Sequence, residues 1–87
     1  MNFDLKTTNW IRVDGLTDGT TYHMQAKQFN QNYEVADMLF TQLSGASPWE
    51  LDDGILCTDV KLTKKENYNV YIRSNSAPVN IQVEEIA

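Results

Sequence analysis

His23 and Cys57 are the only histidine and the only cysteine in this sequence, and an enzyme would use such residues first. A cysteine nucleophile needs a base that stabilises its thiolate, and here that base would have to be His23. A single cysteine can form no intrachain disulfide and no cysteine-rich zinc site. His23 follows a polar alternation with Thr21 and Gln25, so we interpret it as a surface residue. We interpret Cys57 as an inert structural residue and expect no catalytic dyad.

The densest group of carboxylates is Glu50, Asp52, Asp53 and Asp59. Calcium prefers several oxygen ligands from one turn, but this spacing matches no calcium-binding loop. An Asp-Asp-Gly sequence is more typical of an ordinary turn. The sequence also has no phosphate-binding glycine loop, no nucleophile elbow and no histidine pair for zinc. We therefore predict a protein that is not an enzyme, with no catalytic residues, no metal site and no cofactor.

Trp10, Trp49 and Leu51 are the residues we predict at an interface. Trp49 follows Pro48 inside an irregular segment, residues 44–54, where a tryptophan would be an exposed anchor or a plug between subunits. Leu51 belongs to the same segment. Trp10 precedes the apolar Ile11 in a short strand-like stretch, which favours a core or interface position over a sugar-stacking platform.

Alternation of apolar and polar residues predicts the elements that would position these side chains. Strands are expected at residues 9–13, 20–28, 56–62, 68–74 and 79–83. Residues 33–43 combine helical spacing with β-prone side chains, and we interpret them as a further strand. Short strands separated by turns predict an all-β fold, a small antiparallel β-sandwich or barrel, of which a jelly roll is one form. The whole chain, residues 1–87, is expected to be a single β domain.

The same alternation predicts which side chains face the core. The core residues expected from it are Tyr22, Met24, Val70, Ile72, Ile81 and Val83. On the strand at 56–62, it places Leu56, Val60 and Leu62 on one face and Cys57, Asp59 and Lys61 on the other. It also places Tyr71 and Arg73 on a wet face, opposite Val70 and Ile72.

Charge and hydropathy limit the partners. Twelve acidic residues against seven basic ones give a net charge of −5, whereas a nucleic-acid binder needs a basic face. The Lys64-Lys65 pair, followed by Glu66, is interpreted as a solvated turn. The first ten residues lack the basic region and the following apolar region of a secretory signal peptide. No apolar run in the sequence is long enough to span a membrane. We expect a complete small gene product that binds neither nucleic acid nor membrane and acts as a unit of something larger.

Residues 15–22, Gly-Leu-Thr-Asp-Gly-Thr-Thr-Tyr, resemble the turn and tyrosine corner of fibronectin type III domains. In that family the corner comes late in the chain. Tyr22 has too few residues before it for the preceding strands, so a complete fibronectin domain is excluded.

A second resemblance covers about 75 residues. The elements that carry it, in order, are Trp10, Gly15-Leu16, Gly19-Thr20-Thr21-Tyr22, Gln25, Pro48, Gly54-Ile55-Leu56, Val70-Tyr71-Ile72-Arg73, Ser76-Ala77 and the alternating residues 79–84. This ordered set resembles small structural proteins of tailed bacteriophages. The resemblance implies a non-catalytic virion component of the capsid-decoration, head-fibre or tail-attachment type.

The expected partners follow from that resemblance. They are a capsid or tail protein of the same particle and further copies of this chain, of which a homotrimer is the favoured assembly. The expected location is the virion, with the host cytoplasm as the location during assembly. A small domain without a disulfide would gain stability from such an oligomer.

Two other functions stay open. The first is a carbohydrate-binding or host-surface adhesion module that uses Trp49 and Tyr33, which predicts a monomer with exposed, coplanar aromatic rings. The second is a phage-encoded inhibitor of a host protein, which predicts an acidic patch of a single sign.

Overall fold

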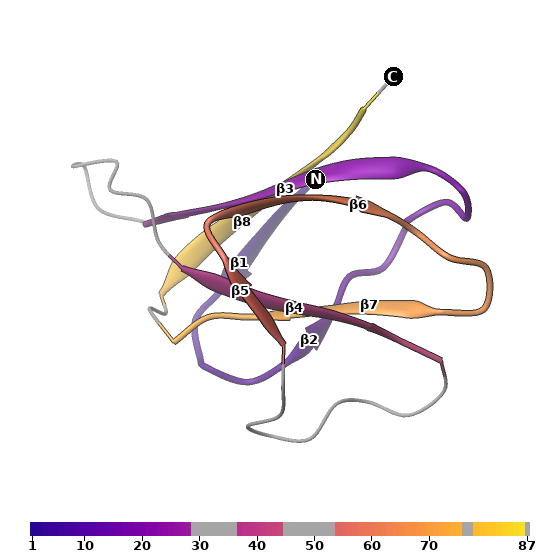
Figure 1. Ribbon diagram of the computed structural model, residues 1–87. Helices are drawn as coiled ribbons and strands as arrows, with labels where there is room; N and C mark the ends of the chain where they lie inside the picture. Colours follow the sequence, from indigo (N-terminus) through magenta and orange to yellow (C-terminus); the bar gives the residue numbers. More distant parts are fainter. Residues whose placement is uncertain (29–36, 45–53, 76–77, 87) are drawn as a thin grey trace.

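The computed structural model describes residues 1–28, 37–44, 54–75 and 78–86, and these residues form eight β-strands and no helix (Figure 1). The strands are β1 (Asn2–Leu5), β2 (Ile11–Arg12), β3 (Thr21–Gln28), β4 (Met38–Leu43), β5 (Ile55–Cys57), β6 (Asp59–Thr63), β7 (Asn69–Arg73) and β8 (Val79–Glu85). The described chain thus contains no helix that could cross a membrane.

The strands form two antiparallel sheets that face each other. The first sheet has the order β1-β8-β3-β6 and the second has the order β2-β7-β4-β5. Figure 1 shows β3, β6 and β8 in one layer and β2, β4 and β7 in the other. This pair of strand orders is that of the eight-stranded jelly roll, in which the chain crosses repeatedly between two sheets. The predicted all-β antiparallel fold is confirmed, and of the two forms expected, sandwich or barrel, the chain adopts the sandwich.

The hydrophobic core lies between the two sheets. All six residues predicted to face it are buried, each at most 5% exposed. The remaining buried members of the cluster are Leu5, Val13, Ala26, Met38, Phe40 and Val79. The strands β3, β7 and β8 alternate inward and outward positions because successive side chains point to opposite faces of a sheet, and their inward apolar residues meet between the two sheets.

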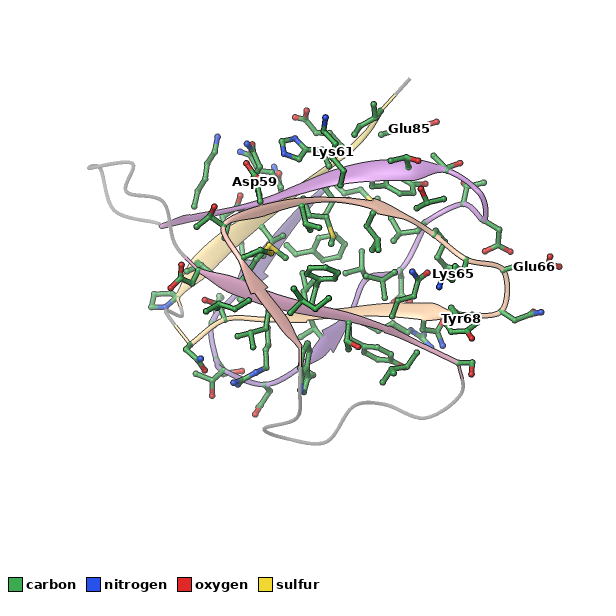
Figure 2. All side chains as sticks on the ribbon, viewed as in Figure 1. Asp59, Lys61, Lys65, Glu66, Tyr68 and Glu85 are labelled. Atoms are coloured by element: carbon green, nitrogen blue, oxygen red, sulfur yellow. The ribbon has the colours of Figure 1, made fainter. Side chains whose placement is uncertain are left out.

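The outer face of the first sheet is polar. His23 on β3 lies between Lys61 of β6 and Glu84 of β8 in the strand register. Figure 2 shows Asp59 and Lys61 on the side of this sheet that points away from the second sheet. Residues of both charge signs, such as Lys61 and Glu84, therefore share this face.

The strand predicted at residues 56–62 is wrong in one respect, because it is two strands in different sheets. β5 belongs to the second sheet and β6 to the first, and the chain passes from one to the other at Thr58. The crossing changes the phase of the alternation. Leu56 is therefore 61% exposed, whereas Cys57 packs against the core together with Val60 and Leu62.

Other strands differ in their bounds. The predicted strand at 9–13 is the two-residue β2, and the amide of Val13 continues its pairing by donating to the carbonyl of Val70 at 2.8 Å. The strand predicted at 33–43 is β4 in its second half, and residues 33–36 lie outside the described residues. β1 was not predicted, although it pairs along its whole length with β8.

The corner before β3 has the geometry expected from the sequence. The Tyr22 hydroxyl accepts a hydrogen bond from the backbone amide of Thr17 at 2.8 Å. Gly19, whose φ of 80° favours glycine, is bonded through its amide to the carbonyl of Lys64 at 2.7 Å. Lys64, expected in a solvated turn, is instead largely covered and pairs with Asp18. The corner therefore ties the start of β3 to the end of β6.

Replacing Tyr22 with phenylalanine should lower the free energy of unfolding by about 1 kcal/mol, because it removes one hydrogen bond and leaves the ring in the core. Urea unfolding followed by far-ultraviolet circular dichroism measures the change. Tyr68→Phe is the matched control, since the Tyr68 side chain is exposed and its contact with Lys65 is made by the ring and not by the hydroxyl. Equal stability of wild type and Tyr22→Phe would show that the corner hydrogen bond contributes nothing.

Candidate functional site

A hollow of about 350 Å³ opens on the outer face of the second sheet. Its walls are Trp10, Arg12, Asp14 and Tyr71. Arg12 and Tyr71 are direct partners across β2 and β7. The hollow therefore lies over the edge of the sheet where β2 joins β7.

A repeated sequence pattern produces this arrangement. Trp10-Ile11-Arg12 and Tyr71-Ile72-Arg73 both read aromatic, isoleucine, arginine. The two isoleucines pair with each other and point into the core, which sends the flanking aromatic and arginine side chains to the outer face. Because the strands are antiparallel, each aromatic residue lies across from the arginine of the other strand.

Arg12 forms an ion pair at the rim of the hollow. Its Nε donates to Oδ1 of Asp14 at 2.7 Å, and both side chains are exposed. The two terminal nitrogens of Arg12 and Oδ2 of Asp14 have no hydrogen-bond partner among the described residues, nor does the hydroxyl of Tyr71. The hollow thus presents donors and an acceptor side by side.

Arg73 lies behind the wall of the hollow and is only 5% exposed. Its guanidinium carbon is 5.6 Å from the centre of the Trp10 ring, a cation–π distance. Its Nη1 donates to the carbonyl of Thr8 at 2.9 Å and its Nη2 to Oδ1 of Asn75 at 2.8 Å. The prediction that Arg73 and Tyr71 face water is wrong, since both are buried on the outer face of the sheet.

Trp10 also contacts the backbone of Gly54, in addition to the Arg73 side chain. A Cβ atom at Gly54 would lie 2.6 Å from Cη2 of Trp10 and 2.9 Å from Cβ of Leu39, both closer than such atoms approach. Only glycine fits at this position unless Trp10 or Leu39 moves. Trp10 is therefore fixed between the backbone of Gly54 and the guanidinium of Arg73.

The predicted interface residues are only partly covered by the structure. Trp49 and Leu51 lie outside the described residues, as does Tyr33 of the alternative glycan site. Trp10 is half-buried and lines the hollow, beside Arg73. Arg12, Asp14 and Tyr71 were not predicted as site residues, although the repeated aromatic-isoleucine-arginine pattern was a readable signal.

The residues examined as nucleophile and base do not meet. His23 lies on the outer face of the first sheet, with Nε2 at 3.9 Å from Oδ2 of Asp59, whereas Cys57 packs against the core. Of the carboxylates considered for calcium, only Asp59 is described. Among the described residues, no three histidine, cysteine or acidic side chains group closely enough to hold a metal ion.

The environment of Cys57 disfavours the thiolate form of its side chain. Partial burial raises the pKa of the thiol, and the negative charges of Asp59 and Asp37 raise it further. The folded state therefore favours the protonated form. The stability that this contributes is complete below the pKa of the unfolded chain and is lost as the pH rises through the folded pKa, in the alkaline range.

Iodoacetamide should alkylate Cys57 several-fold more slowly in the folded protein than in urea at the same pH, because less thiolate is present. The rate is measured by mass spectrometry of the intact chain. Asp59→Asn should raise the rate and Asp4→Asn should not, since Asp4 is not among the charges that act on the thiol. Faster labelling of the folded protein would contradict the raised pKa.

Comparisons with protein-family models, with curated proteins and with solved structures found no match. The function must therefore be inferred from the residues of the chain. Beside the hollow, the second sheet offers one more distinctive surface, the outer edge of β5, which pairs with no other strand in the part of the chain that the structure describes.

The β5 edge is unusual because it carries no charge. Ile55 and Leu56 are 63% and 61% exposed, and they are the most exposed large hydrophobic residues in the described chain. The other sheet edges carry charged side chains, such as Asp4 on β1, Arg12 on β2 and Lys61 on β6. Charges on edge strands discourage pairing with other chains, so β5 is the edge least protected against association.

Proposed function

We propose that this protein is a non-catalytic structural component of a bacteriophage particle, a capsid-decoration or head or tail accessory protein that binds the particle as an oligomer. The ordered sequence resemblance to small phage structural proteins supports this proposal. The jelly-roll strand order supports it by analogy, because viral capsid proteins use that fold, although many unrelated proteins do as well. The expected partners are further copies of the chain and a capsid or tail protein.

The uncharged β5 edge is the observation that most directly supports the proposed oligomer. An 87-residue domain buries only about 60% of the surface of its unfolded chain, so contacts with other copies add a substantial share of the burial. Ile55 and Leu56 offer two large apolar side chains on a strand whose outer edge pairs with no other strand of the described residues. In a trimer, β5 of each copy would meet a different surface of the next copy, and three such contacts close a ring.

Sedimentation velocity of the wild-type chain and of Ile55→Lys/Leu56→Lys tests the oligomer. The wild type should sediment near three times the 10.0 kDa chain mass, and the double variant should sediment as a monomer with an unchanged far-ultraviolet spectrum. Ile86→Lys is the matched control, because Ile86 is a partly exposed residue next to β8, in the other sheet. A wild type that remains monomeric at about 100 μM would overturn the oligomer.

Mass spectrometry of purified particles tests the virion assignment. Many copies per particle would support decoration of the capsid, and few copies would support a tail or vertex position. Absence of the chain from particles that are otherwise complete would refute the assignment.

The hollow beside Trp10 favours a second function, a carbohydrate-binding or adhesion module. Jelly rolls also include lectin domains, and the hollow combines an aromatic wall with polar groups on its rim. The inhibitor alternative gains no support from the outer face of the first sheet, where Lys61 and His23 interrupt the acidic residues.

A further inference from the structure

The size of the hollow limits what it can hold. A volume of about 350 Å³ lies at the lower end of the range for small-molecule sites. The hollow therefore suits one or two ring-sized units. A surface patch for another protein would be larger and flatter.

The polar groups of the hollow suit a ligand that both donates and accepts hydrogen bonds. The free terminal nitrogens of Arg12 are donors, and Oδ2 of Asp14 is an acceptor. Asp14 would repel a phosphate, and Arg12 would repel a simple cation. Hydroxyl groups satisfy both partners at once, and two neighbouring hydroxyls match a donor and an acceptor that are held together by an ion pair.

The remaining wall is an aromatic ring already held in place. Arg73 and the backbone of Gly54 fix Trp10 before any ligand arrives, so little conformational entropy is lost on binding. Polar atoms make up most of the lining of the hollow, so the part of the Trp10 ring that is left uncovered offers a small apolar contact for the C–H groups of a sugar. The free hydroxyl of Tyr71 adds a group that can either donate or accept.

We propose that the hollow formed by Trp10, Arg12, Asp14 and Tyr71 binds a pyranose with neighbouring hydroxyl groups. Arg12 and Asp14 bind the hydroxyls together, and Trp10 forms the apolar wall. This proposal rests on the second function above and is independent of assembly through β5. A neutral hexose offers these hydroxyls, whereas Asp14 would repel the carboxylate of a uronic acid as it would repel a phosphate.

Titration of the ¹⁵N-labelled protein with single sugars, followed by the chemical shifts in ¹H–¹⁵N NMR spectra, tests the site. The probes are methyl β-D-glucopyranoside, methyl β-D-galactopyranoside, methyl α-D-mannopyranoside, N-acetylglucosamine and D-glucuronate, each up to about 50 mM, since single-sugar sites without a metal bind weakly. At least one probe should give saturable shifts that include the indole N–H of Trp10. Saturation by glucuronate alone would contradict the exclusion of anions by Asp14.

Asp14→Asn and Arg12→Gln should each weaken the binding of that sugar about tenfold, because each removes a charge-assisted hydrogen bond. Asp59→Asn is the matched control, since it makes the same change on the outer face of the first sheet, and it should leave binding unchanged. Dispersed spectra show that each variant is folded.

Two results would overturn the sugar site: no saturable shift with any probe, or binding that both hollow variants leave unchanged. Neither result bears on the sedimentation of the β5 variant, so failure of the sugar site and failure of the oligomer are distinguishable.

Discussion

Replacing Ile72 with alanine is expected to lower the free energy of unfolding by about 2 to 5 kcal/mol. Ile72 is fully buried on β7 and lies between Ile11 of β2 and Phe40 of β4 in the register of the second sheet. The truncation leaves a cavity in the centre of the sandwich, which the two sheets could close only by moving closer together. A domain of this length is stable by roughly 4 to 13 kcal/mol, so the loss is a large part of the total.

Urea unfolding followed by circular dichroism measures the effect, with two controls. Ile72→Val should cost only about 0.5 to 1.5 kcal/mol, because it removes one methyl group. Ile55→Ala should stay within about 0.5 kcal/mol, provided that it is measured where the protein is monomeric, since Ile55 is exposed. A loss below about 1 kcal/mol for Ile72→Ala would mean that the core repacks and that Ile72 is not at its centre.

Ile72 could be predicted as a core residue because the signal for it is local. A strand with one buried face must place an apolar residue at every second position, and β3, β7 and β8 all do so over five or more residues. The six predicted core residues come from these three strands, and all are buried. The all-β class followed from the same periodicity together with the spacing of the turns.

The assignment of strands to sheets could not be predicted in this way. Periodicity shows that a side chain faces inward, but it does not show which sheet the strand joins. Residues 56–62 illustrate this, because the crossing at Thr58 moves the chain from the second sheet to the first and exposes Leu56. β1 was missed for a related reason: its four residues alternate too briefly to be recognised, and its partner β8 lies at the other end of the chain.

The candidate site was predictable only in part. Trp10 was singled out for an interface, but the outer face of β7 was expected to be wet. Both Tyr71 and Arg73 are buried there; Trp10 packs against Arg73, and Gly54 brings the backbone against the Trp10 ring. These contacts join residues more than forty positions apart. The local sequence contains only the repeated aromatic-isoleucine-arginine pattern. This pattern indicates that two strands have the same order of residue types, but it does not show that they are neighbours in the sheet.

Arg73 provides the second large effect, because its guanidinium is buried without a carboxylate partner in the described chain. Arg73→Ala should lower the free energy of unfolding by about 2 to 4 kcal/mol, since it removes the packing against Trp10 and leaves the carbonyl of Thr8 without its donor. The indole N–H resonance of Trp10 should shift or broaden at the same time.

Arg73→Met separates packing from charge. The methionine side chain can fill much of the space and contact the Trp10 ring, and the substitution also removes a buried positive charge whose Nε has no hydrogen-bond partner among the described residues. Because the desolvation cost of that charge disappears, Arg73→Met should recover most of the stability that Arg73→Ala loses. If methionine were as destabilising as alanine in urea unfolding, the hydrogen bonds to Thr8 and Asn75 would be the dominant contribution, and the role of Arg73 as packing support for Trp10 would be wrong.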